Sequence, residues 1–173
     1  MKKVFLSFLV AATLFACTSK TTTAEKQIIG FDQSEEGNRV DLYPGDVAGI
    51  KIVEDFVKAH NDRDTATIRS LAATENFKLY GSNGMLSEGS DNHLKAIAPW
   101  FTNNNPKWKL NFCISNSYTN KDGKVQQWVT SGGVLTQTVE GKEVKLNQYY
   151  DVRIVNGKIQ LMYIADRKPT DGE

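Results

Sequence analysis

The stretch KEVKLNQYYDVRIVNGKIQLMYIAD, residues 142–166, decides the fold class of this chain. Apolar and polar residues alternate along its first half, which is the period of a half-buried β-strand. The residues expected on the buried face are Val144, Leu146, Gln148, Tyr150, Val152 and Ile154. Asn156-Gly157 is a preferred dipeptide for a tight hairpin turn, and a final strand is expected from Lys158 to Asp166. The stretch therefore predicts an antiparallel hairpin.

More strands are expected immediately before this hairpin. Residues 108–118 also alternate, and their apolar positions 108, 110, 112 and 114 should share one face. Residues 120–123, Asn-Lys-Asp-Gly, are a hairpin signal, and a long strand is expected over residues 124–139. The paired glycines at positions 132–133 indicate a bulge or a sharp bend within it. The C-terminal half is therefore predicted to be a long, bent antiparallel meander.

The preceding part of the chain has helical periodicity instead. Ile50, Val53, Val57 and His60 recur at spacings of three and four, so a helix with one buried face is expected after Asp46, its predicted N-cap. A second, short helix is expected to begin at Asp64, and its apolar residues lie on one side.

A third helix is expected with Ser90 as its N-cap, and Pro99 should kink or end it. Helices that come first and a strand meander that comes last are typical of an α+β domain. We place this domain at residues 43–168, followed by a polar tail at residues 169–173.

The N-terminus has the pattern of an export signal. Basic Lys2 and Lys3 precede an apolar run from Val4 to Ala16, which is too short to span a bilayer. The run ends in Leu-Phe-Ala-Cys at residues 14–17, which resembles the lipobox of bacterial lipoproteins. That resemblance implies cleavage after residue 16 and a lipid on Cys17. A plain secretory signal cut near Ala16 and an uncleaved anchor are the alternatives.

Residues 17–42 are expected to be a flexible tether, because polar residues dominate and few apolar side chains are available for burial. Ile28, Ile29 and Phe31 are exceptions that could dock on the domain. A lipid anchor implies an exported protein, and Thr18 after the cysteine favours the outer membrane, facing the periplasm, by the same resemblance.

Composition excludes several classes of function. The chain has 21 Lys and Arg against 20 Asp and Glu, and loss of Lys2 and Lys3 with the leader removes the small basic excess. A nucleic-acid partner is therefore not expected. If Cys17 carries a lipid, Cys113 has no partner for an intrachain disulfide. With two histidines and no phosphate-loop or zinc-type spacing, we expect neither a metal nor a cofactor.

The order of elements resembles the nuclear transport factor 2-like (NTF2-like) superfamily, and its SnoaL-like branch in particular. The resemblance covers residues 47–166 and rests on residues 57–64, Val-Lys-Ala-His-Asn-Asp-Arg-Asp, and on residues 155–159, Val-Asn-Gly-Lys-Ile, with Asp166. It implies three N-terminal helices packed on a strongly bent antiparallel sheet, with a conical pocket between them. It also implies a homodimer through the open side of the sheet, where Trp128, Tyr149 and Tyr163 could lie.

Polar residues on otherwise apolar faces are the candidate site residues. His60 could act as an acid, a base or a ligand donor, or simply bond a carbonyl at the helix end. Gln148 and Tyr150 could orient a ligand or be satisfied locally within the core. Asp166 could be a general base, as the resemblance implies, or pair with Arg153 or Arg167. His93 is expected to be solvated.

These residues lead to three hypotheses. The first is a lipid-anchored binding or accessory domain that takes a small apolar or amphipathic ligand without catalysis. Its expected pocket residues are Phe56, His60, Trp100, Phe112, Gln148 and Tyr150. The second is an isomerase or dehydratase that uses Asp166 with help from His60 or Tyr150. The third is a structural envelope or protein-interaction domain.

Overall fold

The computed structural model describes residues 27–34 and 37–170, which form an α+β fold. The helices are α1 (Ala48–Asp62), α2 (Thr65–Leu71) and α3 (Ser90–Asn104). The strands are β1 (Gly30–Gln33), β2 (Arg39–Pro44), β3 (Lys78–Tyr80), β4 (Leu86–Glu88), β5 (Lys107–Thr119), β6 (Val125–Val139), β7 (Lys142–Val155) and β8 (Lys158–Arg167). They form one curved sheet in the order β1-β2-β5-β6-β7-β8-β3-β4.

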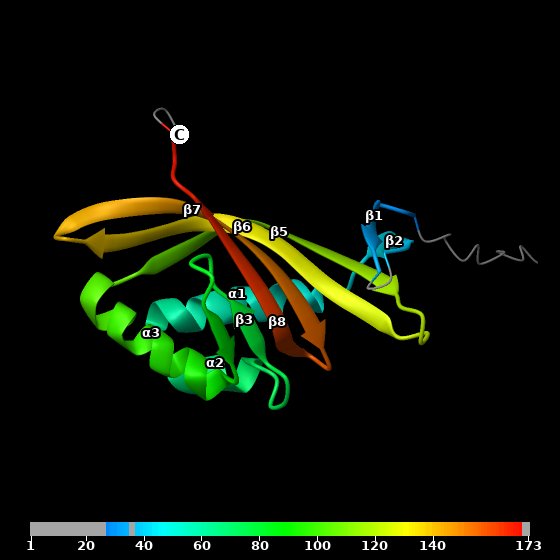
Figure 1. Ribbon diagram of the computed structural model, residues 1–173, viewed down its shortest axis with the longest axis horizontal. Coiled ribbons are helices and arrows are strands. Elements are labelled where there is room, and N and C mark those ends of the chain that lie inside the picture. The colour runs from blue at the N-terminus through cyan, green and yellow to red at the C-terminus, as the bar shows by residue number, and fades with distance from the viewer. Residues whose placement is uncertain (1–26, 35–36, 171–173) are drawn as a thin grey trace, which may run out of the picture.

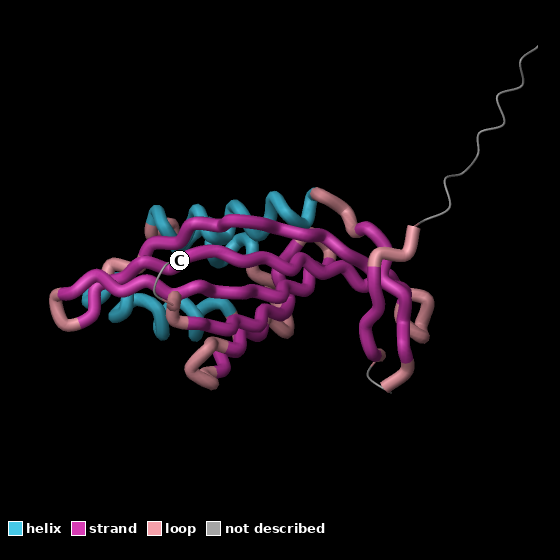
Figure 2. Tube along the Cα trace, turned by 90° about the horizontal axis from the view of Figure 1, so that it is seen from above, coloured by secondary structure: helices cyan, strands magenta, loops and turns pink. Residues whose placement is uncertain are grey.

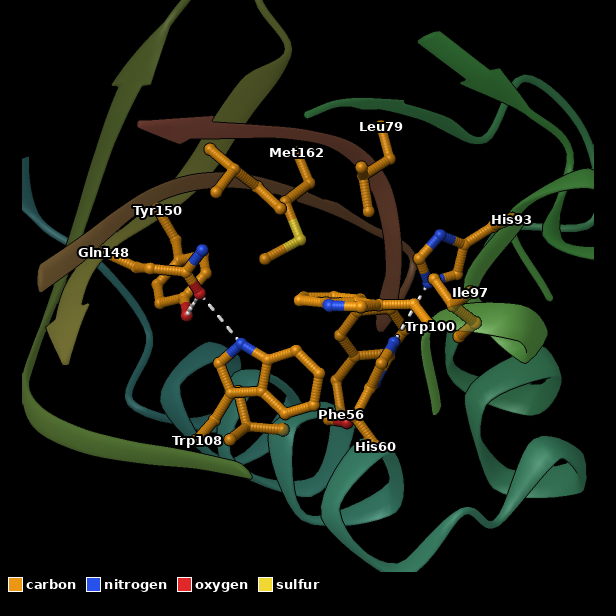
Figure 3. Close-up of a pocket in the computed structure, with 12 residues that line it drawn as sticks. Phe56, His60, Leu79, His93, Ile97, Trp100, Trp108, Gln148, Tyr150 and Met162 are labelled. Atoms are coloured by element: carbon orange, nitrogen blue, oxygen red, sulfur yellow. Dashed lines mark hydrogen bonds between the residues drawn. The ribbon is translucent and has the colours of Figure 1, made fainter. Parts of the chain in front are cut away.

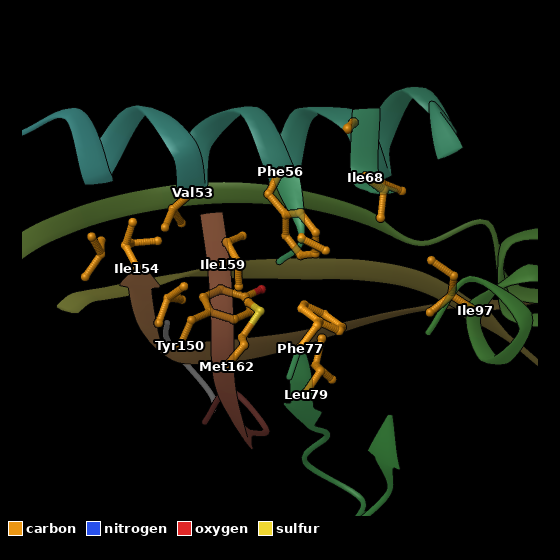
Figure 4. Close-up of a cluster of buried hydrophobic side chains, with 14 of the residues drawn as sticks. Val53, Phe56, Ile68, Phe77, Leu79, Ile97, Tyr150, Ile154, Ile159 and Met162 are labelled. Atoms are coloured by element: carbon orange, nitrogen blue, oxygen red, sulfur yellow. The ribbon is translucent and has the colours of Figure 1, made fainter. Parts of the chain in front are cut away.

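The sheet curves around the helices, so its strands have a concave face toward α1, α2 and α3 and a convex face away from them (Figure 1). The core lies between the two layers (Figure 4). Val53 of α1 is buried there, as the helical spacing predicted, and so is Phe56; both pack against Val152 and Ile159 of the sheet. Each fully buried aliphatic or aromatic side chain contributes roughly 1.5–3 kcal/mol. This layer therefore holds the helices on the concave face.

The predicted hairpin over residues 142–166 is confirmed as β7 and β8. Asn156 and Gly157 have φ values of 50° and 71°, the left-handed pair that a type I′ turn requires. The prediction of three N-terminal helices on an antiparallel sheet is wrong in two respects. Strands β1 and β2 precede the helices. In addition, β3 pairs with β8 in parallel.

The helix starts were predicted to within one residue. Asp64 caps α2 as expected, because its Oδ1 accepts the Thr67 backbone N–H at 3.0 Å. Asp46 lies one residue before the N-cap of α1, yet its Oδ1 accepts the Ala48 N–H at 2.8 Å. Ser90 is the first residue of α3 rather than its cap. Pro99 does not end α3, which continues to residue 104.

A bulge in β5 changes which residues face inward. Leu110 pairs with Gly133 and Phe112 with Gly132, so Asn111 is an extra residue that reverses the alternation. Phe112 therefore lies on the convex face, 43% exposed, and its ring covers Gly132. The prediction that Phe112 shares an inward face with Trp108 is wrong for this reason. The paired glycines did indicate a bulge, but the extra residue is on the neighbouring strand.

The stretch expected to be a tether contains the β1–β2 hairpin. β1 pairs with β2 over residues 30–33 and 39–42, and β2 continues the sheet beside β5. The hairpin lies at one end of the molecule, apart from the helices (Figure 2). Ile28, Ile29 and Phe31 are each about half exposed and do not dock into the core. The leader and Cys17 lie outside the described residues, and no described helix is long and apolar enough to span a membrane.

Candidate functional site

A cavity lies between the concave face of the sheet and helices α1 and α3 (Figure 3). Its inner chamber has a volume of about 70 Å³ and its outer chamber about 400 Å³. The inner chamber is lined by Phe56, Val57, His60, Leu79, His93, Ile97, Trp100, Trp108, Gln148, Tyr150, Met162 and Ile164. Six of these residues, among them Trp100 and Gln148, also line the outer chamber, so the two chambers adjoin.

The two histidines of the chain meet in the inner chamber. Their Nε2 atoms are 2.9 Å apart, and His60 Nδ1 is 2.7 Å from the Phe56 carbonyl oxygen. A carbonyl can only accept, so His60 must carry its proton on Nδ1 and leave Nε2 as an acceptor. His93 must then donate from Nε2, and its Nδ1 keeps a lone pair. The contacts thus determine both tautomers.

Burial keeps both rings neutral. His60 is 7% exposed and His93 is 5% exposed. Burial lowers the pKa of His60 to about 4, and burial together with the neighbouring His60 lowers the pKa of His93 to about 3. The expectation that His93 is solvated is wrong, because α3 turns this first-turn residue toward α1. At neutral pH the pair adds polarity to the chamber without adding charge.

Gln148 links residues of the inner chamber to Asp166 of the outer chamber through hydrogen bonds. Its Oε1 accepts two hydrogen bonds, from Trp108 Nε1 at 2.8 Å and from the Tyr150 hydroxyl at 2.7 Å. Its Nε2 donates to Asp166 Oδ1 at 2.7 Å. Burial, and then the charge of Asp166, raise the pKa of Tyr150, so its phenol stays protonated. Gln148 and Tyr150 therefore support each other within the cavity wall.

Asp166 lies at the rim of the outer chamber and is exposed. Its Oδ2 accepts from the Ser82 hydroxyl at 2.6 Å, while Gln148 occupies Oδ1. Of the two arginines expected as its partners, Arg153 stacks instead over Trp128 on the convex face, 5.8 Å from the ring centre. Gln148 also stands between Asp166 and Tyr150, and His60 is bonded to Phe56 and His93 instead. The structure therefore does not join the three proposed catalytic residues in one hydrogen-bonded group.

The charge in the cavity is confined to one residue. Among the described residues, Asp166 is the only Asp, Glu, Lys or Arg that lines either chamber. Trp100 crosses the boundary between the chambers, where its Nε1 donates to Gln137 Oε1 at 2.7 Å. Within the described residues there is no group of three or more His, Cys, Asp or Glu side chains that could hold a metal ion.

Most of the residues named from the sequence lie in the cavity wall, and other wall residues were not named. Phe56, His60, Trp100, Gln148 and Tyr150 all line the inner chamber. Phe112 does not, because of the bulge. Ser82 and Gln137 were not recognised, and their positions in a turn and near a strand end gave no signal. The one signal for His93 was its helical register with Leu94 and Ile97.

The convex face carries the aromatic residues suggested for a dimer contact. Tyr149 and Tyr163 are 46% and 45% exposed. Tyr163 stacks between Tyr80 and Trp128, with ring centroids 5.1 and 6.5 Å away. This row crosses β3, β8 and β6 on the side away from the cavity. A homodimer through this face remains a prediction.

Known structures share this fold, although neither a protein-family model nor a curated protein matches the sequence. An LEH-like epoxide hydrolase of M. tuberculosis has 13% identity and a TM-score of 0.57, over 70% of this chain and 84% of its own. An NTF2-like protein of unknown function from Burkholderia pseudomallei has 15% identity and a TM-score of 0.57, over 69% and 91%. A protein with a ketosteroid isomerase-like fold from Catenulispora acidiphila, solved with trimethylamine, has 14% identity and a TM-score of 0.52, over 65% and 82%.

Proposed function

We propose that this chain, whose fold is NTF2-like, is an exported lipoprotein whose domain binds a small apolar or amphipathic molecule in its conical cavity. The observation that carries the binding proposal is the inner chamber. Apolar and aromatic side chains dominate its lining, and its polar groups bond to one another rather than converge on one point. Such a surface favours an apolar ligand through burial.

Catalysis has weaker support from the same residues. An isomerase or dehydratase needs a base within reach of its substrate and its helper groups. Asp166 is exposed and bonded to Ser82 and Gln148, and both histidines are neutral and bonded within the wall. Neighbours of this fold include an epoxide hydrolase, but fold alone does not carry chemistry from one protein to another.

Binding can be tested through the tryptophans of the cavity wall. Trp100 and Trp108 border the inner chamber, so an occupant there should change their fluorescence and raise the melting temperature. We suggest 1-hexanol as the probe, titrated into the purified full chain. Ile97→Trp should fill the chamber and abolish the response, while Val125→Trp, at a 67% exposed position far from the cavity, should keep it. No response of the unmodified protein to any chain length of alcohol would contradict the proposal.

The membrane anchor rests on the sequence of the leader. We propose that a lipid on Cys17 holds the domain at the periplasmic face of the outer membrane. Two or more acyl chains are enough for stable anchoring, since each buried methylene contributes about 0.8 kcal/mol. Mass spectrometry of the native protein should find a lipidated N-terminal cysteine. An intact leader or an unmodified thiol, or a Cys17→Ser protein that stays with the membrane, would refute the anchor.

A further inference from the structure

The cavity is poor in free hydrogen-bond donors. The indole N–H groups of Trp100 and Trp108 are committed to Gln137 and Gln148. The Tyr150 hydroxyl donates to Gln148, and the Ser82 hydroxyl donates to Asp166. The remaining donors are the Ser87 hydroxyl, the amide N–H groups of the outer chamber and the second N–H of Gln148. A ligand that offers only acceptors therefore finds few partners in this wall.

Free hydrogen-bond acceptors, in contrast, are available in both the inner and the outer chamber. The tautomers assigned above leave His93 Nδ1 with a lone pair, and His93 borders both chambers. At the rim, each carboxylate oxygen of Asp166 accepts one bond from a neutral group. An ionised carboxylate offers about four lone-pair positions, so two bonds do not exhaust it. In the part of the chain that the structure describes, neither chamber is lined by a Lys or Arg that could neutralise its charge.

We infer that the cavity selects amphipathic ligands with a cationic, hydrogen-bond-donating head, such as a primary ammonium, over matching ligands that end in a carboxylate. This inference rests on the proposed binding function and adds the chemical class of the ligand. The apolar tail occupies the inner chamber, between Trp100, Trp108 and Met162. The head stays in the outer chamber, where it donates to Asp166.

The same geometry rejects an anionic head. A carboxylate at the mouth would meet the like charge of Asp166 and would find no cationic residue in the lining. An alcohol avoids the repulsion but also lacks the ion pair. The expected order of affinity is therefore ammonium, then alcohol, then carboxylate. Because Asp166 is exposed, its charge is partly screened, and we expect about a tenfold span from first to last.

Three probes with the same tail test this order. Hexylammonium, 1-hexanol and hexanoate are titrated at pH 7 into the purified full chain, with calorimetry and tryptophan fluorescence as readouts. Asp166→Asn should bring the three affinities to within about threefold of one another while leaving 1-hexanol unchanged. The matched control is Asp151→Asn, which removes a carboxylate from the convex face, where Asp151 bonds to Thr130, and should keep the full order.

The outcomes separate this inference from the function on which it rests. If 1-hexanol binds but hexanoate binds as tightly as hexylammonium, or Asp166→Asn retains the preference, charge selection is overturned and binding stands. If none of the three binds, both fail. If Asp166→Asn does not fold, the salt dependence of ligand binding to the unmodified chain tests the inference instead. Raising the ionic strength from 0.01 to 1 M, where the Debye length falls from about 30 to 3 Å, must weaken hexylammonium binding more than 1-hexanol binding.

Discussion

The concave and convex faces of the same strands differ in how their polar side chains are buried and hydrogen-bonded. On β7, Gln148 and Tyr150 face the cavity and are buried, and the Tyr150 hydroxyl and one N–H of Gln148 donate hydrogen bonds. Their neighbour Tyr149 faces outward and is about half exposed. On the convex side, Trp128 Nε1 and Arg153 Nε are buried atoms without a hydrogen-bond partner among the described residues. The polar groups around Gln148 on the concave face are thus largely paired, although Ser131 Oγ, opposite Tyr150 on the same face, is a buried atom without a partner among the described residues. The convex face has two such buried atoms.

This difference predicts which substitutions on each face lower the stability of the fold. Buried polar groups that are fully paired are costly to disturb, because breaking one bond leaves another group unsatisfied. Exposed groups can be satisfied by water. Substitutions that look equivalent in sequence should therefore differ in cost according to the face on which the side chain lies.

The largest expected effect is at the paired glycines, which face opposite sides. Gly133 faces the concave side, and a Cβ there would overlap the Lys109 carbonyl oxygen and approach Leu110 Cα at 3.0 Å. These are backbone atoms of the bulge, so they cannot move without disrupting the β5–β6 pairing. We expect Gly133→Ala to lower the free energy of unfolding by about 3 kcal/mol or more, measured by urea denaturation.

The matched control is Gly132→Ala on the convex face. Its Cβ would approach the Phe112 ring at 2.5 Å, but this ring is the far end of a partly exposed side chain that can move aside. We expect a loss below about 1 kcal/mol, and relief in the double variant with Phe112→Ala. Equal losses at the two glycines would show that the bulge backbone is not held rigidly.

A second expected effect is a pH dependence that comes from the concave face. The unfolded histidines titrate near pH 6.5, whereas burial holds the folded pKa values of His60 and His93 at about 4 and about 3. Below pH 6.5 the unfolded state therefore binds more protons, and stability falls as the pH falls toward 4. Each histidine contributes a slope of up to about 1.4 kcal/mol per pH unit in this window. His93→Gln should reduce the slope by about half, measured by urea denaturation from pH 7.5 to 4.5.

The convex face supplies the control for this titration. Burial, which outweighs the hydrogen bond from Thr130, raises the pKa of Asp151. A raised folded pKa has the opposite sign, because Asp151 then adds stability as the pH falls through that value and loses it again as the pH rises. Asp151→Asn should leave the slope between pH 6.5 and 5.5 unchanged. If Asp151→Asn changed the pH dependence of stability and His93→Gln did not, the prediction that the histidines cause it would be wrong.

Local patterns predicted most of the fold, and long-range effects account for what they missed. The stripe of α1 and the Asn156-Gly157 turn depend on neighbours in sequence, so spacing was sufficient. The β1–β2 hairpin was missed because its composition is polar and its strands are short. The bulge was expected beside the glycines of β6, but no residue type marked Asn111 of β5 as the extra position.

Site residues were predictable where strand alternation alone determines on which face of the sheet a side chain lies. Gln148 and Tyr150 on β7 followed from period two. Their hydrogen-bond partners did not, because Trp108 is 40 residues from Gln148 and His93 is 33 residues from His60. Asp166 was expected either as a general base or as a strand-end carboxylate, and near the end of β8 its carboxylate lies at the rim of the outer chamber.

The smallest expected effect compares two tryptophans, one on each face. Trp108→Phe removes an N–H that donates to Gln148, and leaves that oxygen with the Tyr150 hydroxyl alone. Trp128→Phe removes an N–H that has no partner among the described residues, so nothing is left unsatisfied. Both changes remove the same ring area, and the difference between them isolates the hydrogen bond. We expect Trp108→Phe to cost about 1 kcal/mol more than Trp128→Phe in urea denaturation. Equal costs would mean that water already competes for Gln148, and the hydrogen bond from Trp108 would then add nothing to stability.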